Sequence, residues 1–217
     1  LLWLAVVLLF PYCKYYIDPD AVAYLTISKR YASGDFTKAI NGYWSPWACW
    51  LTALGIKSGL EAFVSAIVVN TIGATGFLWV SSRLFNRFGL LPPVNGWLHG
   101  VLVVFLASAV YVQSFADLWQ CFFLLLSLYI MLSERFRTQP GYWILYGATG
   151  ALAYFAKAYS FSFFILNTIG CGFFVIQAWK KENRRAFAGM VITSLLTMII
   201  LSAPWIYLLH EKYGSWM

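Results

Sequence analysis

Charged residues are scarce in this sequence. Only 11% of the 217 residues are charged, whereas 61% are hydrophobic and the mean hydropathy is +0.71. A water-soluble domain of this composition would lack the polar side chains that are needed to cover its surface. The composition therefore excludes an ordinary soluble protein and predicts an integral membrane protein.

Metal and redox motifs are also lacking. The four cysteines form no CxxC pair and have no suitably spaced histidines, so the sequence supports neither a zinc site nor a redox motif. We expect Cys121 and Cys171 to be packing residues. Cys13 and Cys49 are expected on one outer face, where a disulfide is a less favoured alternative because the sequence does not fix their distance.

Long hydrophobic runs, in contrast, are abundant. The run 1–10 has no charged region before it and no cleavage site after it, so we interpret it as the tail of a membrane helix. Further runs approach the roughly 20 residues that cross a bilayer, and they cover 60–82, 94–112, 118–132, 142–156, 159–179 and 186–209, with a reversal near Lys157. We predict an all-α integral membrane protein with about seven transmembrane helices, forming a single domain over 1–217 that is truncated at both ends.

The net charge is +7, and many of the basic residues lie in short clusters between the apolar segments. This arrangement indicates membrane topology rather than a nucleic-acid-binding surface. Basic residues cluster in alternate connections, which predicts a cytoplasmic location for those connections. The clusters are Arg83 and Arg87, Arg135 and Arg137, and Lys180, Lys181, Arg184 and Arg185. The segment 14–59 then falls on the extracytoplasmic side, and no nucleic acid is expected as a partner.

The segment 14–59 is the longest connection, and long connections in compact domains are usually functional. Two helices are predicted in it, each opened by a capping residue and a proline, at Asp18-Pro19 and at Ser45-Pro46. Turn signals at 33–35 and 41–42 separate them. Apolar stripes favour two juxtamembrane helices at the interface, and the stripe residues are Ala21, Tyr24, Leu25, Tyr31 and Ala32 in the first and Trp47, Trp50, Leu51 and Leu54 in the second.

Asp18 and Asp20 are the candidate catalytic carboxylates at this surface. Asp18 fits an N-cap, and a first-turn carboxylate such as Asp20 is favoured by the helix dipole. For Asp18 capping outweighs catalysis, whereas Asp20 is not needed as a cap and is the stronger candidate for a general base. The pair could also hold a divalent metal, but two carboxylates are too few ligands to argue for one.

Three further charged residues have a structural and a functional interpretation. Lys157 lies near the outer membrane surface, where it either snorkels to the interface or holds an anionic lipid phosphate. Asp117 ends an S-x-x-D spacing that is first interpreted as a capping box and otherwise as a functional carboxylate. Lys57 adds to the positive charge of the outer segment, which could attract phosphate.

Several motifs resemble the GT-C glycosyltransferases of the protein O-mannosyltransferase and lipid A aminoarabinose transferase group. The resemblance spans nearly the whole chain and rests on Asp18-Pro19-Asp20 before Ala23-Tyr24-Leu25, on 31–35, on Asn41-Gly42-Tyr43-Trp44-Ser45-Pro46, on 153–157, and on 204–206 before 212–214. It places Asp20, with Asp18 second, nearest the family's catalytic acid. It also makes Tyr24 and Trp44 candidate site residues.

The resemblance implies an inverting glycosyltransferase at the extracytoplasmic face of a bacterial or archaeal plasma (inner) membrane. The donor would be a polyprenyl-phosphate-linked sugar, with Lys157 and Lys57 at its phosphate, and the acceptor a lipid, a glycan or a protein. Ser45-Pro46-Trp47 stands where the aminoarabinose transferases carry Lys-Pro-Pro, so the donor is not fixed. Family members are longer, and this membrane module is not expected to act alone.

Two other classes fit some of these features. A transporter or lipid flippase would also place a lysine at membrane depth, but it predicts broken helices and internal repeats, and the sequence shows no repeat. A seven-helix receptor is suggested by the helix count alone. The long outer segment with its paired interfacial helices favours chemistry at the surface.

Overall fold

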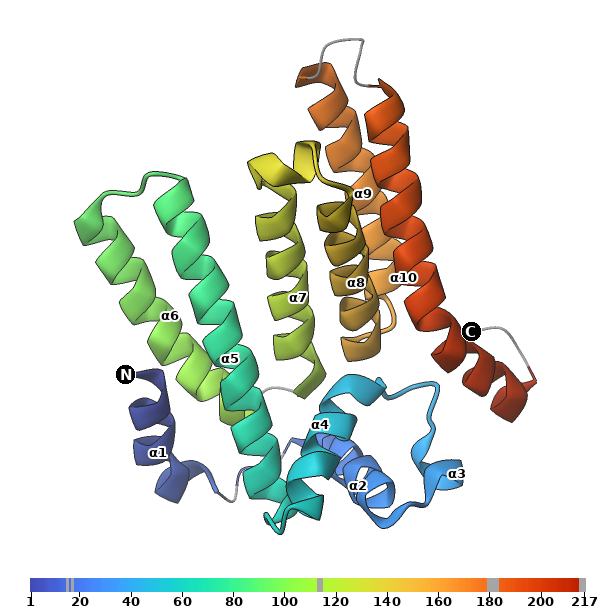
Figure 1. The fold of residues 1–217 in the computed structure, drawn as a ribbon. Coiled ribbons are helices and arrows are strands. Elements are labelled where there is room, and N and C mark those ends of the chain that lie inside the picture. The colour runs from blue at the N-terminus through green and yellow to red at the C-terminus, as the bar shows by residue number, and fades with distance from the viewer. Residues whose placement is uncertain (15, 17, 113–114, 179–183, 215–217) are drawn as a thin grey trace.

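The protein is all-helical throughout the part of the chain that its computed structural model describes, residues 1–14, 16, 18–112, 115–178 and 184–214 (Figure 1). The helices in chain order are α1 (Leu2–Cys13), α2 (Pro19–Ser33), α3 (Phe36–Ala39), α4 (Pro46–Lys57), α5 (Ala62–Arg87), α6 (Pro92–Val112), α7 (Phe115–Met131), the 3-10 helix η1 (Glu134–Arg137), α8 (Pro140–Ala156), α9 (Ser160–Ala178) and α10 (Arg184–Tyr213).

The helices form a bundle with a layer of short helices at one end. Helices α5, α7, α8 and α10 pack in series, with α6 and α1 beside α5 and α9 beside α8 and α10. Helices α2, α3 and α4 cover one end of this bundle, whereas the α5–α6 connection, η1 and the start of α10 lie at the other (Figure 1). The basic clusters around Arg83, Arg135 and Arg184 therefore share the end opposite to α2 and α4.

The prediction of about seven transmembrane helices is wrong for this structure. Among the described residues, three helices are long and apolar enough to cross a bilayer, over Ala62–Arg87, Pro92–Tyr111 and Phe187–Tyr213. Helices α7 and α8 have 17 residues each and α1 has 12. At 1.5 Å per residue, 17 residues extend only about 25 Å, which is less than the hydrocarbon thickness of about 30 Å. The structure supports a possible integral membrane protein with three such helices.

The predicted chain reversal near Lys157 is confirmed. Helix α8 ends at Ala156, Lys157 adopts an extended conformation with φ −157° and ψ 123°, and α9 begins at Ser160. The backbone N–H of Lys157 still donates to the carbonyl of Ala153. The reversal thus occurs directly at the lysine and brings its side chain to the α2–α4 end of the bundle.

The limits of α2 follow from the predicted local signals. Asp18 is the N-cap and its carboxylate accepts a hydrogen bond from the N–H of Asp20, at 3.1 Å. Pro19 occupies the first helical position, and Gly34 ends the helix with a φ of 81°, which favours glycine. Ser45 is likewise the N-cap of α4, although its side chain makes no capping hydrogen bond.

The predicted stripe of α4 is only partly correct. Trp47, Trp50 and Leu51 pack against the core that α2, α4, α5, α7 and α8 share, but Leu54 is 64% exposed. The buried face is instead built from small residues such as Cys49 and Ala53. Because α4 lies against both α2 and α5, small side chains allow the backbones to approach closely.

The cysteines do not pair as considered above. Cys13 and Cys49 are both free, so the alternative of a disulfide between them is not realised. Cys121 is exposed rather than packed in the bundle. The side chain of Cys171 lies outside the described residues.

Gly147 is a position of close contact between α8 and α10. A methyl group added there would overlap the backbone carbonyl oxygen of Ser194 and lie 2.8 Å from Cβ of Thr197. We expect Gly147→Ala to destabilise the protein by about 1–2 kcal/mol, because overpacking costs about 1–3 kcal/mol and the gain in helix propensity offsets up to about 1 kcal/mol. Unfolding of the detergent-solubilised protein measures this change.

Gly189, in the same pair of helices, provides the control. A methyl group there would lie 3.6 Å from the ring of Trp143, which is an ordinary contact. We expect Gly189→Ala to leave the free energy of unfolding unchanged or to raise it by up to about 1 kcal/mol. Equal stability of the two variants would show that Gly147 is not a close-contact position.

Candidate functional site

A cavity of about 350 Å³ lies between the α2–α4 layer and the end of α8. Three segments that are distant in sequence form it: the start of α2, the residues just before α4, and the reversal between α8 and α9. Its lining consists of Asp20, Tyr24, Tyr43, Trp44, Ser45, Lys157, Ala158 and Tyr159. The structure thus brings four of the residues singled out in the sequence, Asp20, Tyr24, Trp44 and Lys157, into one cavity.

Asp20 is the carboxylate of this cavity. It lies in the first turn of α2, and its backbone N–H donates a hydrogen bond to the carboxylate of the N-cap residue Asp18. The positive end of the helix dipole favours a negative charge at this position. Asp18 therefore acts as the cap, whereas the side chain of Asp20 is available to the cavity.

Lys157 is the cation of the same cavity, and it is paired. Its ammonium group donates to the carboxylate of Asp117, at the start of α7, and both side chains are about one-third exposed (30% and 35%). The Lys157 nitrogen also lies 5.5 Å from the ring centroid of Tyr159. A lysine carries three donors, so this pair fixes the side chain without using its whole hydrogen-bonding capacity.

Tyr24 forms the inner wall. Burial raises the pKa of its hydroxyl, and the neighbouring Cys49 thiol and the carboxylates of Asp117 and Asp20 raise it further. Tyr24 therefore stays a neutral phenol over the physiological pH range. Its ring packs edge-on against Trp44, with 5.1 Å between the ring centroids.

Three predicted site residues, Asp18, Lys57 and Asp117, do not line this cavity. Asp18 is occupied as the cap of α2. Lys57 lies in the last turn of α4, which begins at Pro46 beside the cavity. At 1.5 Å per residue the helix carries Lys57 about 17 Å away along its axis. The structure therefore does not bring Lys57 together with Lys157.

The capping-box interpretation of Asp117 depends on Ser114, which lies outside the described residues. What the structure does give is the long-range pair between Asp117 and Lys157. Asp117 is therefore connected to the cavity by its ion pair with Lys157, which lines the cavity.

Sequence reasoning missed several residues of the site. Tyr43, Ser45, Ala158 and Tyr159 line the cavity, and the Tyr159 hydroxyl donates to the side-chain oxygen of Gln120 at 2.6 Å. A signal for Gln120 was available, because it follows Asp117 by three residues and so shares its helix face. Tyr159 had no comparable signal.

The cavity offers a carboxylate, a cation and polar aromatic walls. Among the described residues, no three His, Cys, Asp or Glu side chains are grouped closely enough to hold a metal ion. Larger space exists along α6, where a groove of about 910 Å³ is lined by apolar residues and prolines and lacks ionisable side chains. Of these two spaces, the smaller one is the one lined by ionisable side chains.

Comparison with known proteins gave no match. No family model matches the sequence, and no curated protein or solved structure is significantly similar to it. The site must therefore be interpreted from its own geometry and from the motifs described above.

Proposed function

We propose that this chain is the membrane module of a GT-C-like glycosyltransferase that transfers a sugar from a polyprenyl-phosphate donor to an acceptor hydroxyl at the extracytoplasmic membrane face. One observation carries the proposal: Asp20 and Lys157, from helices far apart in sequence, line the same cavity. A carboxylate and a cation facing one small space suit a reaction in which a proton is removed at one side and a phosphate departs at the other.

Asp20 is the general base of the proposed reaction. Its carboxylate takes the proton of the acceptor hydroxyl, and the hydroxyl oxygen attacks the anomeric carbon of the donor sugar. The bond between that carbon and the phosphate oxygen breaks, and the electron pair leaves with the polyprenyl phosphate. Attack opposite to the leaving group inverts the anomeric configuration.

Lys157 stabilises the departing phosphate. A fixed cation is most effective where negative charge develops during the reaction. The pair with Asp117 holds the ammonium group in place beforehand, so little reorganisation is needed. The proposed step does not include Lys57, which lies in the last turn of α4.

Tyr24, Tyr43, Trp44 and Tyr159 supply the walls. Aromatic side chains with a few polar groups are typical of sites that bind small organic ligands. The neutral phenol of Tyr24 can donate a hydrogen bond to a sugar or phosphate oxygen. These walls would orient the sugar between the base and the cation.

Membranes containing the protein, expressed from its complete gene, provide the test. A panel of polyprenyl-phosphate donors carrying different radiolabelled sugars is offered, and both the released polyprenyl phosphate and the labelled product are measured. We expect at least one donor to lose its sugar with equimolar release of polyprenyl phosphate. A donor that crosses the bilayer unchanged would indicate a transporter or flippase instead. If every donor keeps its sugar and none crosses the bilayer, the proposed sugar transfer is rejected.

A further inference from the structure

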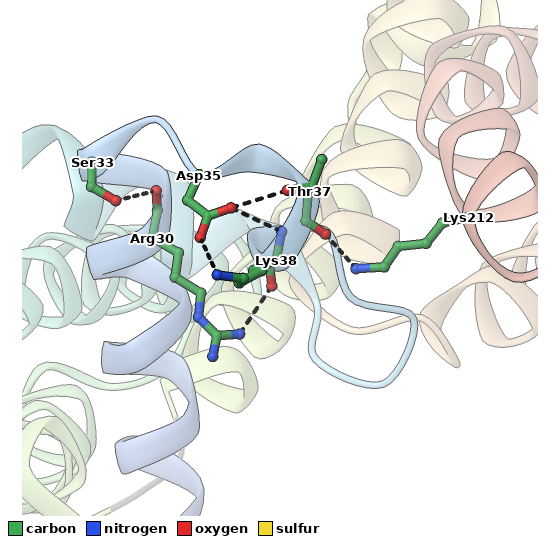
Figure 2. A network of polar contacts seen from close by, with 6 residues as sticks. All are labelled: Arg30, Ser33, Asp35, Thr37, Lys38 and Lys212. Atoms are coloured by element: carbon green, nitrogen blue, oxygen red, sulfur yellow. Dashed lines mark hydrogen bonds and ion pairs between the residues drawn. The ribbon is translucent and has the colours of Figure 1, made fainter.

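The segment just before α4 is fastened to the end of α10, although the two are more than 170 residues apart. We define residues 35–45 as the strap, which begins at the N-cap of α3 and ends at the N-cap of α4. The ammonium group of Lys212 donates to the backbone carbonyls of Thr37 and Ile40, both at 2.6 Å. Figure 2 shows Lys212 reaching from α10 to the carbonyl of Thr37.

These two carbonyls belong to the end of α3, where a helix leaves carbonyl groups without partners of its own. A lysine at such an end satisfies them and complements the negative end of the helix. Here the lysine comes from another helix, so the contact holds two elements together. The Tyr213 hydroxyl adds a long contact by accepting from the N–H of Gly42 at 3.4 Å.

The strap is also ordered from within. The Asp35 carboxylate accepts from the Thr37 hydroxyl and the Lys38 N–H, and Arg30 of α2 donates to the Lys38 carbonyl at 3.1 Å (Figure 2). Ile40 packs against Trp205 and its neighbours in the cluster between α8 and α10. The strap is therefore held from both α2 and α10.

Only two residues separate Ile40 from the cavity wall. The side-chain oxygen of Asn41 accepts from the N–H groups of Tyr43 and Trp44, at 2.8 and 3.0 Å, so this short link is itself a defined turn. Tyr43, Trp44 and Ser45 then line the cavity. A shift of the strap at Ile40 must therefore move the wall.

We propose that Lys212 is a positioning residue, which holds the strap so that Tyr43 and Trp44 form the wall of the candidate site. The expected effect on sugar transfer rests on the proposed function, whereas the expected hold of Lys212 on the strap does not. Because Asp20 is carried by α2 and not by the strap, a loosened strap weakens substrate binding more than it weakens the chemical step.

The test compares Lys212→Met with wild type in two measurements. Hydrogen exchange of the strap amides reports whether the strap is held, and we expect exchange to become about tenfold faster or more in Lys212→Met. Sugar transfer reports the position of the wall, and we expect a fall of about 10–100-fold in kcat/KM, mainly through KM. Lys212→Arg keeps a cation with several N–H donors and should recover most of both values.

Lys38→Met is the matched control. Lys38 is in the strap itself, but its exposed ion pair with Asp35, at 3.5 Å, is of a kind that contributes little. Neither exchange nor transfer should change in this variant. A similar change in Lys38→Met would show a general sensitivity of the strap and would overturn the specific role of Lys212.

The two measurements also separate this inference from the proposed function. Unchanged exchange in Lys212→Met overturns the inference, as does faster exchange with wild-type KM. If wild type transfers no sugar from any donor, the proposed function fails, and hydrogen exchange at the amides of Tyr43 and Trp44 becomes the remaining test of the inference. Faster exchange in Lys212→Met would then support the role of Lys212 in positioning the cavity wall, and unchanged exchange would refute it.

Discussion

Asp20→Asn is expected to lower the rate of sugar transfer by about 10²–10⁴-fold, which is the contribution of a well-placed general base. Asparagine has nearly the same shape but cannot take the proton of the acceptor hydroxyl. Since the walls of the cavity are unchanged, the loss should fall on kcat, with little change in KM. The measurement is the initial rate of label transfer at equal amounts of membrane-inserted protein.

Asp18→Asn is the matched control for this variant. Asp18 caps α2 through its carboxylate, and asparagine caps helices about as well as aspartate. Transfer should therefore stay close to wild type. The opposite pattern, with activity lost in Asp18→Asn and kept in Asp20→Asn, would reassign the base to Asp18. Wild-type rates in both variants would contradict base catalysis by either residue.

The second large effect is expected from Lys157→Met, with a loss of about 10²–10³-fold in transfer, comparable to removing one donor from an oxyanion site. The substitution removes the cation that faces the cavity and leaves the Asp117 carboxylate without its partner lysine. That carboxylate would then repel the donor phosphate. Both donor binding and the departure of the phosphate should suffer, so KM rises and kcat falls.

The double variant Lys157→Met/Asp117→Asn separates these two contributions. If repulsion by Asp117 is part of the loss, the double variant should be more active than Lys157→Met alone, and the rates of the single and double variants together give the coupling. A wild-type rate in Lys157→Met would instead support the interpretation of Lys157 as a lysine that merely snorkels to the membrane surface.

Much of the fold could be predicted from the sequence because local signals set the limits of the helices. The apolar run predicted over 142–156 corresponds to α8 (Pro140–Ala156). Helix α2 begins after the capping residue Asp18 with Pro19 at its first position, and it ends at the C-cap residue Gly34. The number of spans could not be predicted in the same way. Apolar runs show where a helix lies, but the observed lengths of α7 and α8 show that an apolar helix need not be long enough to cross the hydrocarbon.

The candidate site was predictable only in part. The family resemblance and the expected placement near one membrane face predict Asp20, Tyr24, Trp44 and Lys157 as site residues. The pair between Asp117 and Lys157 was missed because the spacing around Asp117 suggests a local cap, and spacing says nothing about a partner 40 residues away. Lys57 lies outside the cavity, in the last turn of α4, because membership in the same outer segment does not imply proximity.

The close packing at Gly147 has a mechanical consequence for the site. Because α8 and α10 are in close contact at Ser194, Lys157 just after α8 and Lys212 near the end of α10 are carried by two helices that pack against each other. Asp20 is carried by α2, which packs against α4, and α4 in turn contacts α8. The candidate cavity therefore lies where the α2–α4 layer meets the ends of two packed helices. A change at this contact would alter the separation of Asp20 and Lys157 and would move the strap, because the strap is bonded to both α2 and α10.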